Sequence, residues 1–287
     1  MDAYKIPIGQ FGEWVMVYTY DNLKPIFTAF KVTAELTVDG FELLFSALPA
    51  LAWIAIVAVV VWRLKGWPLA VFAIVSLLIV DNQGLWDATT LTASIVLTST
   101  IFSLAVAMPL GILMAEYRPA EVIVEPFLDF LITIPRFVIL IPAVVLLGIG
   151  VGPAIFATMT LAVAPPARIT AVGLKQVDAH IVEAAHAFGA NRLQILTKVK
   201  LPLALPSLVL AVNQCLLMSL VMAVIAAFIG AGGLGENILS GIMLLNSGQG
   251  FVAGFGVFAL AILLDRTMRA IVDKMLASPV QPAAEKG

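Results

Sequence analysis

Long apolar runs, separated by short polar segments, occupy most of the chain after residue 42. No Asp, Glu, Lys or Arg occurs in the ranges 43–62, 88–115, 137–167, 201–235 and 237–264. A helix needs about 20 residues, at about 1.5 Å each, to cross roughly 30 Å of hydrocarbon. The strands of a membrane barrel would instead alternate polar and apolar side chains over about 10 residues, and these runs show no such alternation. The pattern therefore predicts an all-α integral membrane protein.

The runs and their breaks predict about seven transmembrane helices, at residues 43–62, 67–81, 88–114, 123–147, 152–173, 203–230 and 250–268. The second is short, and Trp67 and Trp86 flank it as interfacial anchors do. Pro109, Pro135 and Pro142 lie inside expected helices and should kink them. We expect one transmembrane domain rather than several.

The first 42 residues carry an amphipathic pattern. Apolar residues recur there at helical spacing, with charged residues between them: Leu23, Lys24, Ile26, Phe27, Phe30, Lys31, Ala34 and Glu35. This spacing predicts a helix that either lies on the outer membrane surface or packs on the outer face of the protein itself. The expected organisation is an extracytoplasmic tail (1–42), a transmembrane domain (43–275) with a long cytoplasmic loop (174–202), and a cytoplasmic C-terminal tail (276–287).

Composition supports the membrane assignment. Hydrophobic residues make up 61% of the chain and charged residues 12%, whereas soluble proteins carry roughly 25% charged residues. The single Cys215 lies in an apolar run, so neither a disulfide framework nor a cysteine metal site is expected. The N-terminus lacks a basic segment followed by a short apolar one, so no cleaved signal peptide is expected.

Lys and Arg indicate the orientation, because cytoplasmic loops are enriched in both. If the loop at 63–66 lies inside the cell, 12 of the 16 Lys and Arg residues fall inside or at the inner boundary: Arg63, Lys65, Arg118, Arg168, Lys175, Arg192, Lys198, Lys200, Arg266, Arg269, Lys274 and Lys286. The opposing short loops at 82–87, 148–152 and 231–249 contain no Lys or Arg. The N-terminus is therefore expected outside, and the C-terminus inside.

The cytoplasmic loop at 174–202 is unusually polar for its position between two long apolar spans. Asp178 can cap a helix that Gly189 would end, and Asn191 can begin a second helix before Pro202 opens the next span. The expected result is two short helices across the membrane face. Two interpretations are open on composition alone: an ordinary amphipathic loop at the interface, or a docking site for a cytoplasmic partner.

The spacing within this loop resembles the EAA signature of the permease subunits of bacterial ABC importers. The matching positions are Glu183, Ala184, Ala185, Gly189, Leu201 and Pro202, with Val199 where the family usually has Ile. Further segments across roughly residues 43–272 are similar to the glycine betaine/proline-type permeases, among them Ile134-Pro135, Ile141-Pro142, Pro165-Pro166, Ala187-Phe188-Gly189-Ala190, Gly230-Ala231-Gly232-Gly233-Leu234-Gly235 and Leu264-Asp265-Arg266.

The resemblance implies a type I importer permease with the MetI-like fold, in the bacterial cytoplasmic (inner) membrane. Two permease chains, usually identical, would form the pathway in the lipid bilayer, and two cytoplasmic ATPase subunits would dock on the six matching positions. The ATPases would bind ATP and Mg, and an external binding protein would deliver the cargo. That cargo would be a compatible solute: glycine betaine, proline betaine, choline, carnitine or trimethylamine N-oxide.

Several polar and glycine residues are candidates for the pore or its gate. Arg136 stands where relatives commonly have a small or uncharged residue, and a charge at the membrane centre costs about 2.5–3.5 kcal/mol. It should therefore either pair with a carboxylate such as Asp129 or line the pore, where it could contact a cargo carboxylate or N-oxide. Asn213 and Gln214 either form hydrogen bonds to neighbouring helices or line the pore. The glycine-rich segment predicts a flexible turn or a re-entrant segment at the outer mouth of the pathway, where it could be part of a gate. Its glycines are Gly230, Gly232, Gly233 and Gly235.

Other functions have weaker support. Gly230, Gly232 and Gly235 spell G-x-G-x-x-G, but that motif binds dinucleotides only between a strand and a helix. With no phosphate-binding loop motif, no paired acids and no Ser/His constellation in the spans, we expect a non-catalytic subunit without its own cofactor or metal and without a nucleic-acid partner. His180 and His186 lack a third zinc ligand. The remaining rivals are a type I permease for methionine or sulfonates, and an ion-coupled secondary carrier.

Overall fold

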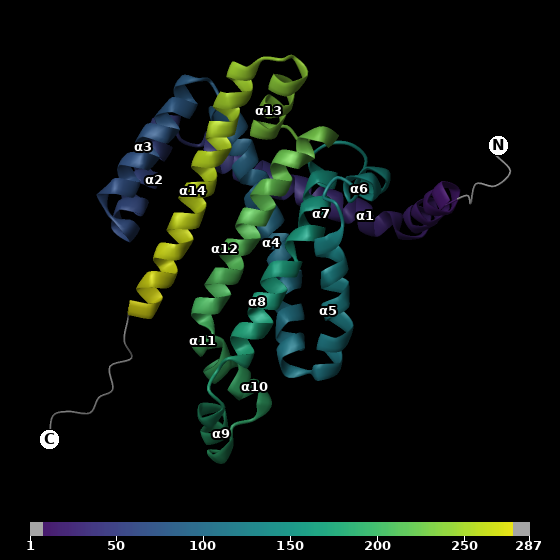
Figure 1. Ribbon diagram of the computed structural model, residues 1–287, viewed down its shortest axis with the longest axis vertical. Coiled ribbons are helices and arrows are strands. Elements are labelled where there is room, and N and C mark those ends of the chain that lie inside the picture. The colour runs from purple at the N-terminus through teal and green to yellow at the C-terminus, as the bar shows by residue number, and fades with distance from the viewer. Residues whose placement is uncertain (1–7, 278–287) are drawn as a thin grey trace.

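The computed structural model describes residues 8–277, and within them every regular element is a helix (Figure 1). The elements are α1 (Ile8–Ser46), α2 (Ala50–Lys65), α3 (Trp67–Asn82), α4 (Trp86–Glu116), α5 (Arg118–Thr133), α6 (Leu140–Leu147), α7 (Val151–Ala162), α8 (Ala164–Lys175), α9 (Ala179–Ala187), α10 (Arg192–Ile195), the π-helix η2 (Leu196–Lys200), α11 (Leu201–Leu203), α12 (Leu205–Ile225), the 3₁₀-helix η3 (Ala226–Ile229), α13 (Gly233–Met243) and α14 (Ser247–Ala277). An all-helical chain satisfies its backbone polar groups within each segment, as a hydrocarbon environment requires.

The centre of the bundle is formed by α4, α8 and α12, which pack against one another. Two glycines allow the close approach. A Cβ atom placed on Gly111 of α4 would lie 2.5 Å from the carbonyl oxygen of Ala167, and one on Gly173 of α8 would lie 2.5 Å from Cβ of Ser207. Small residues at helix contacts are typical of membrane bundles, where packing drives association. The bundle is flanked by α5 on one side and by α14 with the α2–α3 hairpin on the other (Figure 1).

The expected count of seven membrane-spanning helices is not confirmed. By length and composition, four helical stretches of the described chain can cross a membrane: Trp86–Glu116, Val151–Lys175, Leu205–Ile229 and Ser247–Met275. A fifth arises if α1 and α2 count as one broken span, but they are bent by 95° around Pro49. α3 has only 16 residues. The span expected at 123–147 is interrupted, because the helix ends at Thr133 and resumes only at Leu140.

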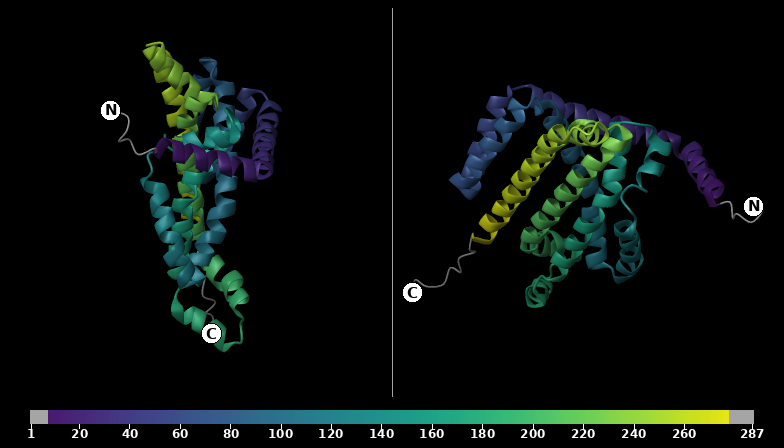
Figure 2. Two further views of the ribbon diagram at one scale, coloured as in Figure 1. Left: turned by 90° about the vertical axis from the view of Figure 1, so that its right-hand side faces the viewer. Right: turned by 45° about the horizontal axis from the view of Figure 1, so that its top comes forward.

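The N-terminal amphipathic pattern forms part of one long helix, α1, that lies across the end of the bundle opposite α9 (Figures 1 and 2). Its C-terminal half packs on the protein itself: Ala34 and Val38 are buried, and Phe30 makes edge-to-face contacts with Phe102 and Phe156. The N-terminal half extends beyond the bundle and exposes apolar side chains such as Trp14. Of the two predicted alternatives, packing on the protein itself is therefore correct for the C-terminal half of α1. Most of the expected C-terminal tail, with Lys286, lies outside the described residues, as does Lys5.

Candidate coupling loop and translocation pathway

The polar loop predicted at 174–202 lies at one end of the molecule and joins α8 to α12 (Figure 1). Its first helix, α9, begins where the Asp178 carboxylate accepts a hydrogen bond from the backbone N–H of His180 at 2.8 Å. The chain leaves α9 through Gly189, whose φ of +82° is a left-handed conformation that favours glycine. Both predicted boundaries of this helix are confirmed. The Glu183 side chain is 76% exposed and projects from a helix without buried residues.

The second helix of the loop begins at Asn191, as predicted. Asn191 and Gln194 form a capping box, in which each side chain accepts a hydrogen bond from the other's backbone N–H at 2.9 Å. The helix then differs from the expectation, because α10 passes into a five-residue π-helix before α11. Ile195 is the buried residue of α10. Pro202 is the second residue of α11 and follows the π-helix without a break.

Charged pairs fasten the base of the loop to its neighbours. The Lys200 ammonium lies 2.6 Å from the Glu116 carboxylate at the end of α4, with both side chains mostly buried. Lys175, at the end of α8, pairs with Glu121 of α5 at 2.5 Å. Beyond these pairs the loop offers an exposed surface that includes Phe188 and Leu193. The loop is therefore tied to α4 and α5 at its base and exposed at its tip.

The break between α5 and α6 carries Arg136, and its side chain is exposed. The carboxylate proposed for it is engaged elsewhere, because Asp129 pairs with Arg168 of α8 at 2.5 Å. Arg168 also lies 3.4 Å from Glu125. The interpretation of Arg136 as the partner of Asp129 is therefore wrong. Sequence spacing placed the two on one helix face, but the helix ends between them.

The glycine segment after η3 is a turn that packs tightly in the bundle, not a loose surface loop. Gly230, Gly232 and Gly233 have φ values of +76°, +79° and +72°. The backbone N–H of Leu234 donates to the Thr92 hydroxyl at 2.8 Å, and Gly233 and Leu234 are buried. Gly235 is also buried, and a Cβ atom placed on it would lie 2.6 Å from the Val224 carbonyl oxygen. Side chains larger than hydrogen are excluded here by backbone conformation and by space.

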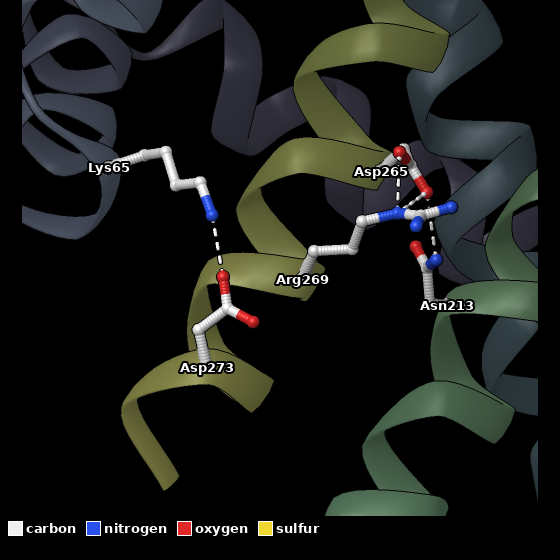
Figure 3. Close-up of polar contacts among 5 residues, drawn as sticks. All are labelled: Lys65, Asn213, Asp265, Arg269 and Asp273. Carbon is white, nitrogen blue, oxygen red and sulfur yellow. Dashed lines mark hydrogen bonds and ion pairs between the residues drawn. The ribbon is translucent and has the colours of Figure 1, made fainter. Parts of the chain in front are cut away.

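The two polar residues of α12 face different surroundings. Asn213 is buried, and its amide nitrogen donates to the Asp265 carboxylate of α14 at 3.0 Å, while Arg269 holds the same carboxylate at 2.9 Å (Figure 3). Gln214 is exposed. The interhelical interpretation therefore fits Asn213, and pore lining stays a prediction for Gln214. Asp265 was not identified from the sequence as the partner of Asn213, although the segment Leu264-Asp265-Arg266 was noted there.

Comparison with known proteins places these features in a family. Residues 107–277 match the family described as binding-protein-dependent transport system inner membrane component. The chain belongs to this family of permeases.

Individual relatives agree with that assignment. The glycine betaine/proline betaine transport system permease protein ProW of Escherichia coli is 38% identical over 259 residues, which cover 90% of this chain and 72% of that protein. The glycine betaine/carnitine transport permease protein GbuB of Listeria monocytogenes is 40% identical over 243 residues, 83% of this chain and 86% of that protein. A chain of the inward-facing MetNI methionine ABC transporter has a TM-score of 0.62 at 25% sequence identity. The match covers 67% of the present chain and 95% of the MetNI chain.

The matched region covers the candidate site and leaves the N-terminal elements outside. Residues 107–277 begin within α4 and include the α5–α6 break, the coupling loop, the glycine turn and α14. The fold is that of the type I ABC importer permeases. The elements α1 to α3 precede the family region. The described residues contain no group of three or more His, Cys, Asp or Glu side chains that could hold a metal ion.

Proposed function

We propose that this permease forms the translocation pathway for a methylated ammonium osmolyte, and that a separate cytoplasmic ATPase drives it by docking on the loop at 174–202. The cargo class is that of glycine betaine, proline betaine, choline, carnitine and trimethylamine N-oxide. Two relatives at 38–40% identity, a glycine betaine/proline betaine permease and a glycine betaine/carnitine permease, support this class. The observation that carries the coupling role is α9, an exposed and capped helix that bears Glu183 at the end of the bundle.

The loop can transmit a displacement because both of its ends are continuous with packed helices. α9 follows α8 after three residues, and the segment from α10 to α11 leads directly into α12. The Lys200–Glu116 and Lys175–Glu121 pairs tie the same base to α4 and α5. In this mechanism ATP closes the ATPase dimer, the two loops move together, and the cavity turns outward to accept cargo. Hydrolysis of ATP then resets the pathway inward.

The assembly that this mechanism requires has two permease chains, two ATPases and an external binding protein. ATP and Mg bind to the ATPase partner, and the permease itself is non-catalytic. In the bacterial cytoplasmic membrane, the N-terminus lies on the external side and the C-terminus on the cytoplasmic side, so that α9 faces the ATPase. High affinity for the cargo resides in the binding protein, which hands the cargo to the permease.

Within the pathway, we assign Arg136 to the pore wall. Its guanidinium is exposed and its expected partner Asp129 is held by Arg168. A cationic wall repels a bare trimethylammonium ion and attracts a carboxylate or N-oxide oxygen, so zwitterionic cargo is favoured over choline. The glycine turn with Gly230 and Gly233 is proposed as part of the outer gate. A methionine permease is the weaker alternative, since the similarity to the methionine transporter chain is 25% identity.

Replacement of Glu183 with Arg tests the coupling role. Because the side chain is 76% exposed, the substitution should change the stability of the permease by no more than about 0.5 kcal/mol. We expect normal membrane insertion, loss of ATPase copurification and loss of solute uptake. The matched control is Glu236→Arg, an exposed carboxylate on α13 at the opposite end of the molecule (Figure 1), which should retain the ATPase.

Normal uptake by the Glu183→Arg variant would contradict the coupling role. A second measurement separates the importer from a secondary carrier. Purified permease alone in liposomes should accumulate no solute against a gradient, and accumulation without an ATPase would overturn the proposed function.

A further inference from the structure

Two exposed phenylalanines meet beside the break between α5 and α6. The rings of Phe137, in the break, and Phe228, in η3, lie 5.2 Å apart at an interplanar angle of 89°. Each residue is 54% exposed. Their edge-to-face arrangement is a favourable one for aromatic pairs and leaves ring surface open to a ligand. The two residues come from segments that are 91 positions apart in the sequence, so the pair exists only in the folded chain.

The pair lies near one end of the apolar spans, because Phe228 is one residue from the end of the span Leu205–Ile229, and the break beside it reaches deeper. Leu140, the first residue of α6, packs in one cluster with Leu161 of α7 and Met222 of α12. Leu161 is ten residues from the start of the span Val151–Lys175, and Met222 is seven residues from the end of the span Leu205–Ile229. At about 1.5 Å per residue, these positions are roughly 10–15 Å inside the spans. Leu140 and the adjoining end of the break therefore lie within the hydrocarbon thickness, and Phe228 lies near its edge.

This surface cannot face lipid. Non-helical backbone within the hydrocarbon is tolerated only where it is buried in protein or lines a water-filled cavity. In the single chain, Pro135, Arg136 and Phe137 are all exposed. An arginine facing hydrocarbon would add a cost of its own. The exposed face of the break must therefore contact protein or line the aqueous pathway, and the exposed charge of Arg136 favours the pathway.

We propose that Phe137 and Phe228 form an aromatic contact for the methylated ammonium group of the cargo inside the pathway, while Arg136 takes its carboxylate or N-oxide oxygen. The proposal rests on the proposed function and adds the residues that recognise the cargo. A cation is attracted to the negative face of an aromatic ring, and this attraction is the usual means of binding quaternary ammonium groups. The arginine supplies the opposite charge for the anionic end.

Two rings bind a methylated ammonium group only weakly, and weak binding lets the cargo leave the site during transport. Cages that hold quaternary ammonium groups tightly surround them with several rings, whereas this pair offers two rings on an open surface. One exposed ring changes affinity by about two- to fivefold. Such a contact guides the cargo past the break without retaining it.

The test uses the complete importer, with permease, ATPase and binding protein, reconstituted in liposomes. We compare uptake of glycine betaine by the wild type, Phe137→Leu, Phe228→Leu and the double variant. Each single variant should lower the maximal rate about two- to fivefold, and the double variant about tenfold. The concentration for half-maximal uptake should stay unchanged, because the binding protein sets it. Phe137→Tyr and Phe228→Tyr, which keep a ring face, should retain most of the rate.

Phe258→Leu is the matched control, since Phe258 is also 54% exposed but lies on the regular helix α14. It should transport at the wild-type rate. If the leucine variants fail to assemble, 3,5-difluorophenylalanine at positions 137 and 228 weakens the ring face at nearly unchanged size and should lower the maximal rate in the same way.

Wild-type uptake by the double leucine variant, or equal losses in the leucine and tyrosine variants, would overturn the aromatic contact and leave the proposed function standing. Absence of glycine betaine uptake by the wild-type importer, tested also with carnitine and trimethylamine N-oxide, would overturn both.

Discussion

At the scale of single residues, the polar network between α12 and α14 makes a prediction about stability (Figure 3). Asn213→Leu removes one interhelical hydrogen bond to Asp265, and such bonds contribute about 0.6 kcal/mol on average in membrane proteins. Asp265→Ala should cost more, because it leaves both the Asn213 amide and the Arg269 guanidinium without this carboxylate. Unfolding in mixed detergent micelles measures both changes.

The neighbouring Gln214 supplies the control for this comparison. It is exposed on the same helix, so Gln214→Leu should leave the unfolding free energy unchanged within about 0.5 kcal/mol. A larger loss for Asn213→Leu than for Asp265→Ala would show that the network does not stabilise the α12–α14 contact in this way.

The sequence identified polar residues within the apolar spans, but it did not distinguish their surroundings or their partners. Asn213 and Gln214 were identified as polar residues in an apolar span, and one step along a helix turns about 100°, so that one is buried and the other exposed. The partner Asp265 is 52 positions away. The pairing of Arg168 with Asp129, 39 positions apart, was likewise beyond a periodicity argument. Tertiary partners of this kind follow from helix packing, which the spacing of side chains does not encode.

At the scale of elements, the contact between α8 and α12 depends on Gly173. A Cβ atom there would lie 2.5 Å from Cβ of Ser207, so Gly173→Ala must push the two helices apart. We expect a loss of about 1–3 kcal/mol, read as a lower thermal unfolding temperature of the purified permease. Gly254→Ala is the control, because nothing lies within 4 Å of a Cβ atom on Gly254. Equal melting temperatures for the two variants would refute a close contact at Gly173.

Element boundaries were predictable where a side chain caps its own helix. Asp178, Gly189 and Asn191 act within a few residues, and all three mark the boundaries that the sequence indicated. The interruption at 134–139 was not predicted. Pro135 was interpreted as a kink because most prolines in membrane helices are accommodated by neighbours. Here the chain instead leaves the helix for six residues. The π-helix at Leu196–Lys200 had no recognised signal at all.

At the scale of the whole molecule, composition and run length predicted the all-helical membrane fold, and the motif spacing predicted the family. The arrangement of the N-terminal elements was less accessible. The amphipathic pattern at 23–35 could not indicate that α1 continues to Ser46 and crosses the end of the bundle (Figure 2). That course depends on contacts with α4, α6 and α7, which are distant in sequence.

The orientation proposed for the molecule can be tested by labelling introduced cysteines. The only native cysteine, Cys215, is fully buried and provides a silent background. Phe188 and Leu245 are 93% and 90% exposed, at the coupling loop and at the turn before α14 respectively. A membrane-impermeant maleimide should label Leu245→Cys in right-side-out vesicles and should label Phe188→Cys only after permeabilisation. Bound ATPase should further protect Phe188→Cys, because the proposed docking surface includes it. Labelling of Phe188→Cys from outside would reverse the orientation and remove the ATPase from the loop on which the coupling mechanism depends.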